Sequence, residues 1–447
     1  MVGDGVTVEQ QAETALTRPR RLERMLAGAM LLTLFVKVPG LSLFPILSAG
    51  FAVALLPVTV GQLKKSAILR VLYGACLLAL ASGLALSLWV PRHLGVPGDP
   101  GTVATVLGWL VVIPLIVSLG VWAASFFTFR TALLLVTIGG LFGAAASEGT
   151  GWKSSFGIYE TLLVLALVSR MPVAVTRLVL IGSAVLSAVL DARSMAVISL
   201  LVLVSTFVTP SVRARFTTRP FRSTVVALIG LSAALDAALW AMRAGVLGAA
   251  IQARTLEQMQ GGRSVLATGR QEWSATLQLF AHNPLGYGVA TQVDGGIASA
   301  GDSAVKAAGG DYTASYFRVF VFGPRTDLHS MLADLWYHFG FGGVVFAGAC
   351  ALVLVLGLTK AFGQQAGLSA LLVYAILGAA WDLLFSPMGN SDRLMVGMLA
   401  ALAVGLAQNP AGKPGAADGD DRTDGVGQEF LGHKAGSRQS RVLAGEE

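Results

Sequence analysis

Residues 103–124 read VATVLGWLVVIPLIVSLGVWAA, an apolar run of 22 residues without a charged side chain. A helix of about 20 such residues spans the hydrocarbon core of a bilayer. Similar runs recur along the 447-residue chain, which is 54% hydrophobic and 13% charged, with a mean hydropathy of +0.70. A soluble domain carries about 25% charged residues. The sequence therefore predicts an all-α polytopic membrane protein and excludes the soluble classes.

Twelve apolar runs approach the length that a transmembrane helix needs. Three of them are short, so we expect about twelve transmembrane helices. The 53 glycines fit close packing between membrane helices. The predicted spans cover residues 25–38, 41–60, 68–90, 103–124, 131–147, 156–169, 174–190, 194–209, 223–249, 331–358, 366–385 and 393–408.

Basic residues between the spans predict the orientation. If the N-terminus is cytoplasmic, the inside loops carry 15 Lys and Arg and the short outside loops carry 5, namely Lys37, Arg92, Lys153, Arg193 and Arg393. The positive-inside rule then places both termini in the cytoplasm and the chain in the inner (cytoplasmic) membrane. Because the basic residues set topology in this way, the net charge of +7 is no sign of nucleic-acid binding.

The same pattern divides the chain into five segments. Residues 1–24 form a cytoplasmic N-terminal tail, and 25–249 form nine transmembrane helices. Residues 250–330 form one large extracytoplasmic loop, and 331–408 form the last three transmembrane helices. Residues 409–447 are rich in Gly, Asp, Lys and Arg and predict a disordered cytoplasmic tail. The long loop is the only extramembrane segment large enough to build a site.

Two residues at the predicted outer face suggest chemistry. His329 precedes the span at 331–358, where an imidazole with a near-neutral pKa suits a proton acceptor; the alternative is an interfacial polar residue without chemistry. His338, nine residues on, is expected to point half a turn away and to matter far less. Arg193 suits an anion because its guanidinium fork matches phosphate oxygens; the alternative is an ion pair with Asp191.

The outer loop contains two further patterned stretches. Residues 264–281 predict an amphipathic helix whose apolar side, including Trp273, Leu277 and Phe280, faces the membrane surface. Residues 283–288 read NPLGYG, a turn in which Pro fixes φ and Gly accepts positive φ. The loop contains no Asp-x-Asp pair; Asp418-Gly419-Asp420 lies in the C-terminal tail. The loop therefore has no acidic pair of the kind that holds a catalytic divalent cation.

Taken together, these motifs resemble those of the O-antigen ligase and O-antigen polymerase superfamily. His329-Ser330, nine residues and then GFGG at 340–343 resemble that family's H-[N/S/Q]-x9-G-x-x-G motif. GRQEW at 269–273 with NPLGYG at 283–288 resembles its G-R-x-x-W and N-P-L-x-G-x-G segment. DARS at 191–194 resembles its S-R-[S/T] signature, although Asp191-Ala192 departs from the usual lead-in. The specific resemblance covers about residues 190–360.

The resemblance implies a metal-independent membrane glycosyltransferase without a cofactor. The donor is a glycan linked to polyprenyl diphosphate, and the acceptor is another glycan or a lipid-linked glycan at the outer leaflet of the membrane. His329 is then the catalytic residue, and Arg193 and Arg270 bind the diphosphate as negative charge develops on it. Trp273, Ser330, Gly340 and Gly343 support the motifs. Ligase and polymerase are not separated by these motifs.

Two other classes remain open. A secondary transporter of a small solute or ion needs ionisable groups near the middle of the membrane, for which Asp236 and Asp382 are the main candidates. A non-catalytic partner in envelope assembly would retain the motifs without turnover. Turnover of a lipid-linked glycan by the purified protein distinguishes the enzyme from both.

Overall fold

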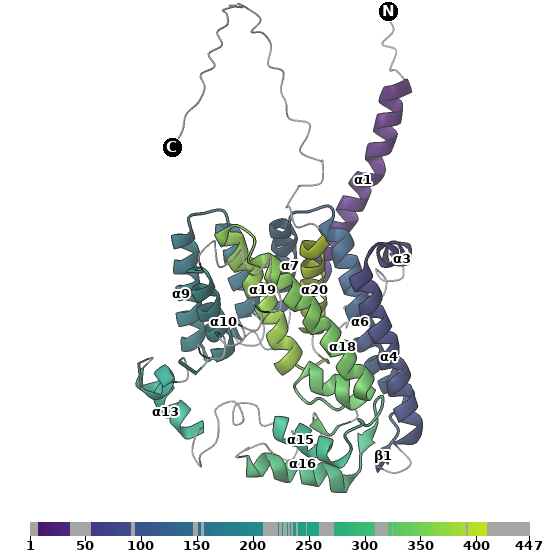
Figure 1. Ribbon diagram of the computed structural model, residues 1–447, viewed down its shortest axis with the longest axis vertical. Coiled ribbons are helices and arrows are strands. Elements are labelled where there is room, and N and C mark those ends of the chain that lie inside the picture. The colour runs from purple at the N-terminus through teal and green to yellow at the C-terminus, as the bar shows by residue number, and fades with distance from the viewer. Residues whose placement is uncertain are drawn as a thin grey trace, which may run out of the picture. The chain divides into compact units, whose positions relative to one another are not determined.

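The computed structural model is mostly helical (Figure 1). It describes residues 8–35, 55–90, 94–145, 151–152, 156–208, a few positions between 222 and 246, 248–258, 272–308, 321–389 without 324, and 392–408. The predicted spans at 41–60 and 223–249 lie largely outside the described residues, as does the predicted tail at 409–447.

Four of the described helices are long and apolar enough to cross a membrane. They are α4 (Ala67–Trp89), α6 (Pro100–Ala124), α18 (Met331–Ala361) and α19 (Ala366–Phe385). All four coincide with predicted spans to within a few residues. The helical class is therefore confirmed and the membrane prediction supported, whereas the number of twelve spans stays a prediction.

Shorter apolar helices fill other predicted spans, and three further helices before residue 260 overlap the predicted spans only in part. The apolar ones are α7 (Phe129–Ala145), α8 (Gly157–Val168), α9 (Val173–Val189), α10 (Arg193–Ser205) and α20 (Asp392–Gln408). The others are α1 (Val8–Thr33), α3 (Leu56–Lys65) and α13 (Ala249–Gln258). Helix α1 covers most of the predicted span at 25–38 and begins within the stretch predicted as a polar tail. Helix α3 carries Lys64 and Lys65 in its last turn.

Helix α18 is central to the packing. It lies along α4 and also contacts α19 and α20, while α20 packs on α6 (Figure 1). Gly342 allows the close approach of α18 to α4, because a Cβ there would meet the Leu78 carbonyl oxygen at 2.7 Å and the Ser82 side chain at 2.8 Å. Gly342 is therefore one of the glycines at which the close helix packing expected from the composition is seen.

A second, smaller layer lies at the C-terminal end of α4. It contains α15 (Glu272–His282), α16 (Gly295–Ala307) and a two-stranded antiparallel sheet of β1 (Gly95–Val96) and β2 (Gln292–Val293), in which Gly95 pairs with Val293. Its apolar core includes Leu279, Tyr287 and Tyr337. Because α4 has 23 residues, its two ends are about 34 Å apart. The layer is thus separated from Lys64 and Lys65 by the length of a membrane-crossing helix.

Candidate functional site

Helix α18 is broken at Gly340. This residue has φ 56° and ψ −142°, a conformation that only glycine adopts without strain. A Cβ at this position would also overlap the carbonyl oxygen of Leu285 and the side chain of Leu86. The sequence predicted one continuous helix here, so the break is a correction. It separates a short buried segment, Met331–Phe339, from the longer apolar segment that follows.

The NPLGYG turn packs on this short segment. The backbone N–H groups of Tyr287 and Gly288 donate to the carbonyl oxygen of Tyr337 at 2.7 and 3.1 Å. Trp336 Nε1 donates to the carbonyl oxygen of Pro284 at 2.9 Å. Gly286 has φ 94°, and a Cβ on it would meet the Trp336 carbonyl oxygen at 2.6 Å. Two motifs about 50 residues apart in the sequence therefore fold as one unit.

Gly343 closes the break from the other side. A Cβ on Gly343 would overlap the carbonyl oxygen of Leu335, in the segment before the break. Both motif glycines thus shape the break, and Gly340 also lies against Leu86 of α4. Ser330 caps the start of α18, where its Oγ accepts from the backbone N–H of Ala333 at 3.3 Å. Its predicted role as motif support is therefore a helix cap.

His329 lies directly before this cap, in a turn with a carboxylate partner. Asp327 Oδ1 accepts from the His329 backbone N–H at 3.0 Å and lies 3.2 Å from the imidazole Nδ1. The His329 and Asp327 side chains are 27% and 24% exposed, so both are reachable from the surface. If Nδ1–H donates to the carboxylate, Nε2 is the basic nitrogen of the neutral imidazole.

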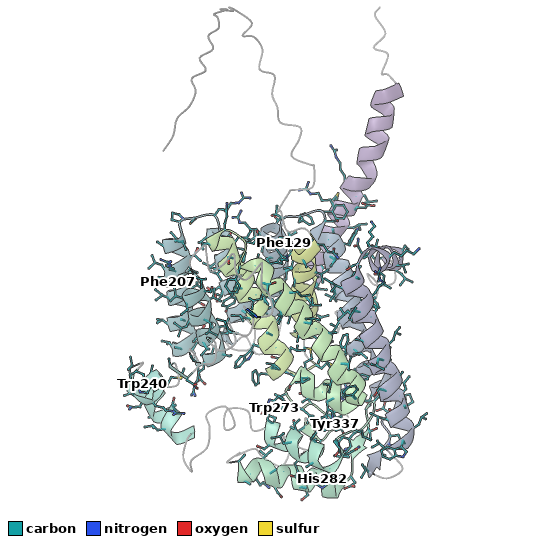
Figure 2. The ribbon with its side chains drawn as sticks, viewed as in Figure 1. Phe129, Phe207, Trp240, Trp273, His282 and Tyr337 are labelled. Carbon is teal, nitrogen blue, oxygen red and sulfur yellow. The ribbon has the colours of Figure 1, made fainter. Side chains whose placement is uncertain are left out.

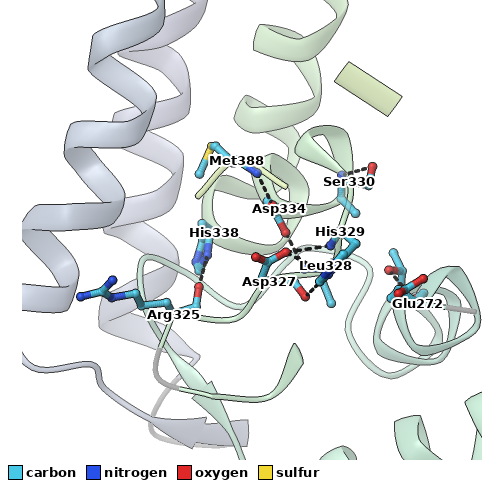
Figure 3. A network of polar contacts seen from close by, with 11 residues as sticks. Glu272, Arg325, Asp327, Leu328, His329, Ser330, Asp334, His338 and Met388 are labelled. Carbon is cyan, nitrogen blue, oxygen red and sulfur yellow. Dashed lines mark hydrogen bonds and ion pairs between the residues drawn. The ribbon is translucent and has the colours of Figure 1, made fainter. Parts of the chain in front are cut away.

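Two carboxylates tune the charge of His329. Burial alone would lower the pKa of this histidine, but the hydrogen bond and charge of Asp327, together with the charge of Glu272, raise it above the ordinary value of 6.5. Glu272 is buried in the first turn of α15 and faces His329 from that separate helix (Figure 3). Two carboxylates therefore favour the protonated form of His329.

Asp334 holds the turn through both oxygens of its carboxylate. Its Oδ1 accepts from the backbone N–H of Leu328 and its Oδ2 from that of Met388, both at 2.8 Å. The side chain is 1% exposed and lies in the first turn of α18 (Figure 3). One buried carboxylate thus connects the His329 turn to the connection between α19 and α20. Sequence reasoning missed Asp327, Glu272 and Asp334; the available signal was an acidic residue two positions before the histidine.

His338 belongs to the fold. It is fully buried; the Ala290 backbone N–H points to its Nδ1 at 3.3 Å, and its Nε2 lies 3.2 Å from the Arg325 carbonyl oxygen (Figure 3). Both ring nitrogens therefore have backbone partners, which assigns Nδ1 as the acceptor and Nε2–H as the donor.

Of the two predicted anion-binding residues, Arg193 and Arg270, the structure describes only Arg193. Arg193 begins α10, and its Nε lies 3.4 Å from Asp191 Oδ1, so the alternative of a local ion pair is confirmed as a contact. Asp191 has φ 58°. Helix α10 packs on α9 and α19. Arg270 lies outside the described residues. The convergence of Arg193, Arg270 and His329 on one site therefore stays a prediction.

Trp273 follows Glu272 on α15, at the same end of the molecule as Tyr337 (Figure 2). Its side chain is half-buried, and within the described part of the chain its indole Nε1–H has no hydrogen-bond acceptor. On the same helix Leu277 and Phe280 are exposed, the arrangement predicted for a surface-facing apolar side. The first part of that predicted amphipathic helix, before Glu272, lies outside the described residues.

The remaining candidates are weaker. Asp382, near the end of α19, accepts a hydrogen bond from Ser386 Oγ at 2.8 Å, and Asp236 is exposed. Among the described residues, no group of three or more His, Cys, Asp or Glu is arranged to hold a metal ion.

Comparison of the chain with protein-family models, with curated proteins and with solved structures finds no match. Any assignment of function to this chain therefore depends on the motifs and on the way they fold together.

Proposed function

We propose that this protein is a metal-independent membrane glycosyltransferase of the O-antigen ligase or polymerase type. It would transfer a glycan from polyprenyl diphosphate to a sugar hydroxyl at the outer leaflet. The observation that carries the proposal is the joint folding of the motifs. NPLGYG packs on the segment between His329 and Gly340, and Glu272 of the GRQEW motif faces the same histidine.

His329 acts as the general base in this proposal. Its Nε2 accepts the proton of the acceptor hydroxyl as that oxygen attacks the anomeric carbon of the donor. The bond between the anomeric carbon and the diphosphate oxygen breaks, and the electron pair leaves with polyprenyl diphosphate. The proton remains on His329 until it passes to solvent or to the leaving diphosphate. Partial exposure of the imidazole gives the acceptor access to it.

Negative charge that develops on the leaving diphosphate needs a fixed cationic partner. Arg193 and Arg270 take this role because a guanidinium stays charged and binds phosphate oxygens through two parallel hydrogen bonds. Arg193 would have to exchange its contact with Asp191, or share it, when the donor binds. The donor lipid and the acceptor glycan are the partners, and the enzyme requires no cofactor in this scheme.

Product analysis of the purified protein in lipid nanodiscs tests the proposal. The protein is incubated with a polyprenyl diphosphate oligosaccharide, alone or with a glycan acceptor, in buffer containing a chelator. A ladder of products indicates a polymerase, and a single addition indicates a ligase. No transfer by the wild type with any acceptor class would count against the enzyme, and solute uptake into proteoliposomes would then favour a transporter.

Matched histidine variants assign the site. His329→Ala should abolish transfer while much of the donor affinity is retained. His282 is the control, because it is exposed at the end of α15 and contacts only its own helix through the Gln278 carbonyl oxygen in the described structure. Near-normal turnover by His329→Ala would remove the catalytic role from this residue.

A further inference from the structure

We propose that Asp327 is a positioning residue for His329, and that Asp334 fixes the turn that carries both. This inference rests on the proposed function for its kinetic consequences, whereas the geometry it describes exists without substrate. It adds two acidic residues to the site and makes the connection between α19 and α20 part of its support.

The turn before α18 needs such support. Thr326 has φ 36° and His329 has φ 52°, so two non-glycine residues within four positions are in the left-handed region. L-residues rarely adopt this conformation, and it persists where surrounding contacts hold it. Glycine at either position would relieve the strain, but it would remove the His329 imidazole or the Thr326 hydroxyl, which donates to the Gly323 carbonyl oxygen.

Asp327 contacts two nitrogen atoms of His329, one in the backbone and one in the ring. A single oxygen, Oδ1, accepts from the His329 backbone N–H at 3.0 Å and lies 3.2 Å from Nδ1 of the ring. This arrangement fixes the ring relative to its own backbone and favours the tautomer with the proton on Nδ1. Nε2 is then the nitrogen that carries the lone pair in the neutral ring. An imidazole without this partner could rotate and present either nitrogen.

Asp334 holds the turn relative to the rest of the protein. It stands in the first turn of α18 and receives backbone N–H groups from Leu328, beside His329, and from Met388. Its own backbone N–H donates to the Ser330 carbonyl oxygen at 2.8 Å. On the far side, Arg393 Nη1 donates to the carbonyl oxygens of Met388 and Gly389 at 3.0 and 2.7 Å. The Met388–Gly389 segment is therefore bound from both α18 and α20.

The charged groups around His329 come from three elements. Asp327 lies on its own turn, Glu272 faces it from α15, and Asp334 lies behind it on α18. The α19–α20 connection contributes the Met388 backbone N–H, and Arg393 is directed to that connection. Removal of the Asp327 charge therefore takes away one of the two carboxylates that raise the pKa of the partly exposed imidazole. Its protonation should shift toward lower pH.

Histidine NMR combined with kinetics tests the inference. The His329 resonance is assigned by its loss in His329→Gln, and its titration is compared between wild type and Asp327→Asn. In Asp327→Asn we expect the titration midpoint to move to lower pH, with a changed ¹⁵N tautomer signature. The kcat should fall on the order of 10²-fold, as expected for a weakened general base, while the KM for donor changes little.

The control is Asp294→Asn, because Asp294 caps α16 by accepting from the backbone N–H groups of Gly296 and Ile297 at 2.7 and 3.0 Å and is not among the groups that shift the pKa of His329. It should leave the His329 titration unchanged. Asp334→Asn should lower kcat and alter the His329 signal without a change in donor KM.

An identical His329 titration and tautomer in wild type and Asp327→Asn would overturn the positioning role, whatever the activity. An unaltered His329 signal in folded Asp334→Asn would overturn the role of that residue. If the wild type transfers no glycan, the proposed function fails, and the NMR measurement still decides whether Asp327 positions the ring.

Discussion

Substitution of Gly340 by alanine is the sharpest test of the broken helix. Gly340 has φ 56° and ψ −142°, and a new Cβ would overlap the carbonyl oxygen of Leu285 and the side chain of Leu86. The backbone oxygen cannot move without displacing the NPLGYG turn, which is bonded to Tyr337 and Trp336. Strain at Gly340 should therefore spread to the motif that packs on it.

The magnitude follows from two terms. A non-glycine residue in this backbone region costs about 1–3 kcal/mol. Overpacking against a fixed neighbour costs a further 1–3 kcal/mol or so, which makes the sum about 2–6 kcal/mol. Gly348 lies in the same helix with open space around its Cβ position, so Gly348→Ala should be neutral or stabilise the helix by up to about 1 kcal/mol.

Thermal unfolding in nanodiscs, together with the transfer assay, measures both variants. Gly340→Ala should lower the apparent melting temperature and reduce transfer strongly, while Gly348→Ala should retain both properties. If Gly340→Ala matches Gly348→Ala in stability and turnover, the helix is not broken at Gly340 and the argument is wrong.

Three further predictions follow from the topology and the charges. Cysteines placed at Lys64 and Ala300, in a chain without its native cysteines, should react with an impermeant reagent from opposite sides; labelling of both in intact cells would contradict the orientation. Arg193→Ala and Arg270→Ala should lose donor binding or turnover, and lysine should rescue each poorly because a point charge cannot replace the planar fork; wild-type turnover by the lysine variants would argue against bidentate binding. Turnover should fall as pH decreases through the pKa of His329, which lies above 6.5, because only the neutral imidazole accepts a proton; a flat profile from pH 5 to 8 would remove the base.

The raised pKa of His329 also makes the stability of the folded state depend on pH. A group that binds its proton more tightly when folded stabilises the folded state at low pH, below its unfolded pKa near 6.5. That contribution is lost as pH rises through the higher folded value. The His329–Asp327 pair should therefore favour folding slightly below neutrality, the pH range in which the proposed base is inactive.

The long helices were predictable because lipid and length constrain them directly. The apolar runs at 103–124 and 366–385 coincide with α6 and α19 within three residues at each end. Asp99 and Pro100 mark the start of α6, with Asp99 Oδ1 accepting from two backbone N–H groups. A local pattern of apolarity, cap and proline is enough for such elements.

The broken helix and the acidic site were not predictable in the same way. A Gly-rich stretch inside an apolar run fits both close helix packing and a break, and tertiary contacts from residues about 50 positions away decide between them. Glu272 reaches His329 from a separate helix, and Asp334 connects the histidine turn to Met388, 54 residues further on, so no spacing in the sequence indicates either contact. Only the motif resemblance connected these segments, and it did not include the carboxylates.

The role of His338 changes how the site must be tested. A position half a turn from His329 suggested a harmless control, but His338 is fully buried between the Ala290 N–H and the Arg325 carbonyl oxygen. Its truncation would leave buried groups without partners, at about 1–3 kcal/mol each. A loss of activity in His338→Ala would therefore report on folding and would not weaken the case for His329. Because His282 is exposed and Asp294 caps the separate helix α16, equal losses in their variants and in His329→Ala are the result that would refute the chemistry assigned to His329.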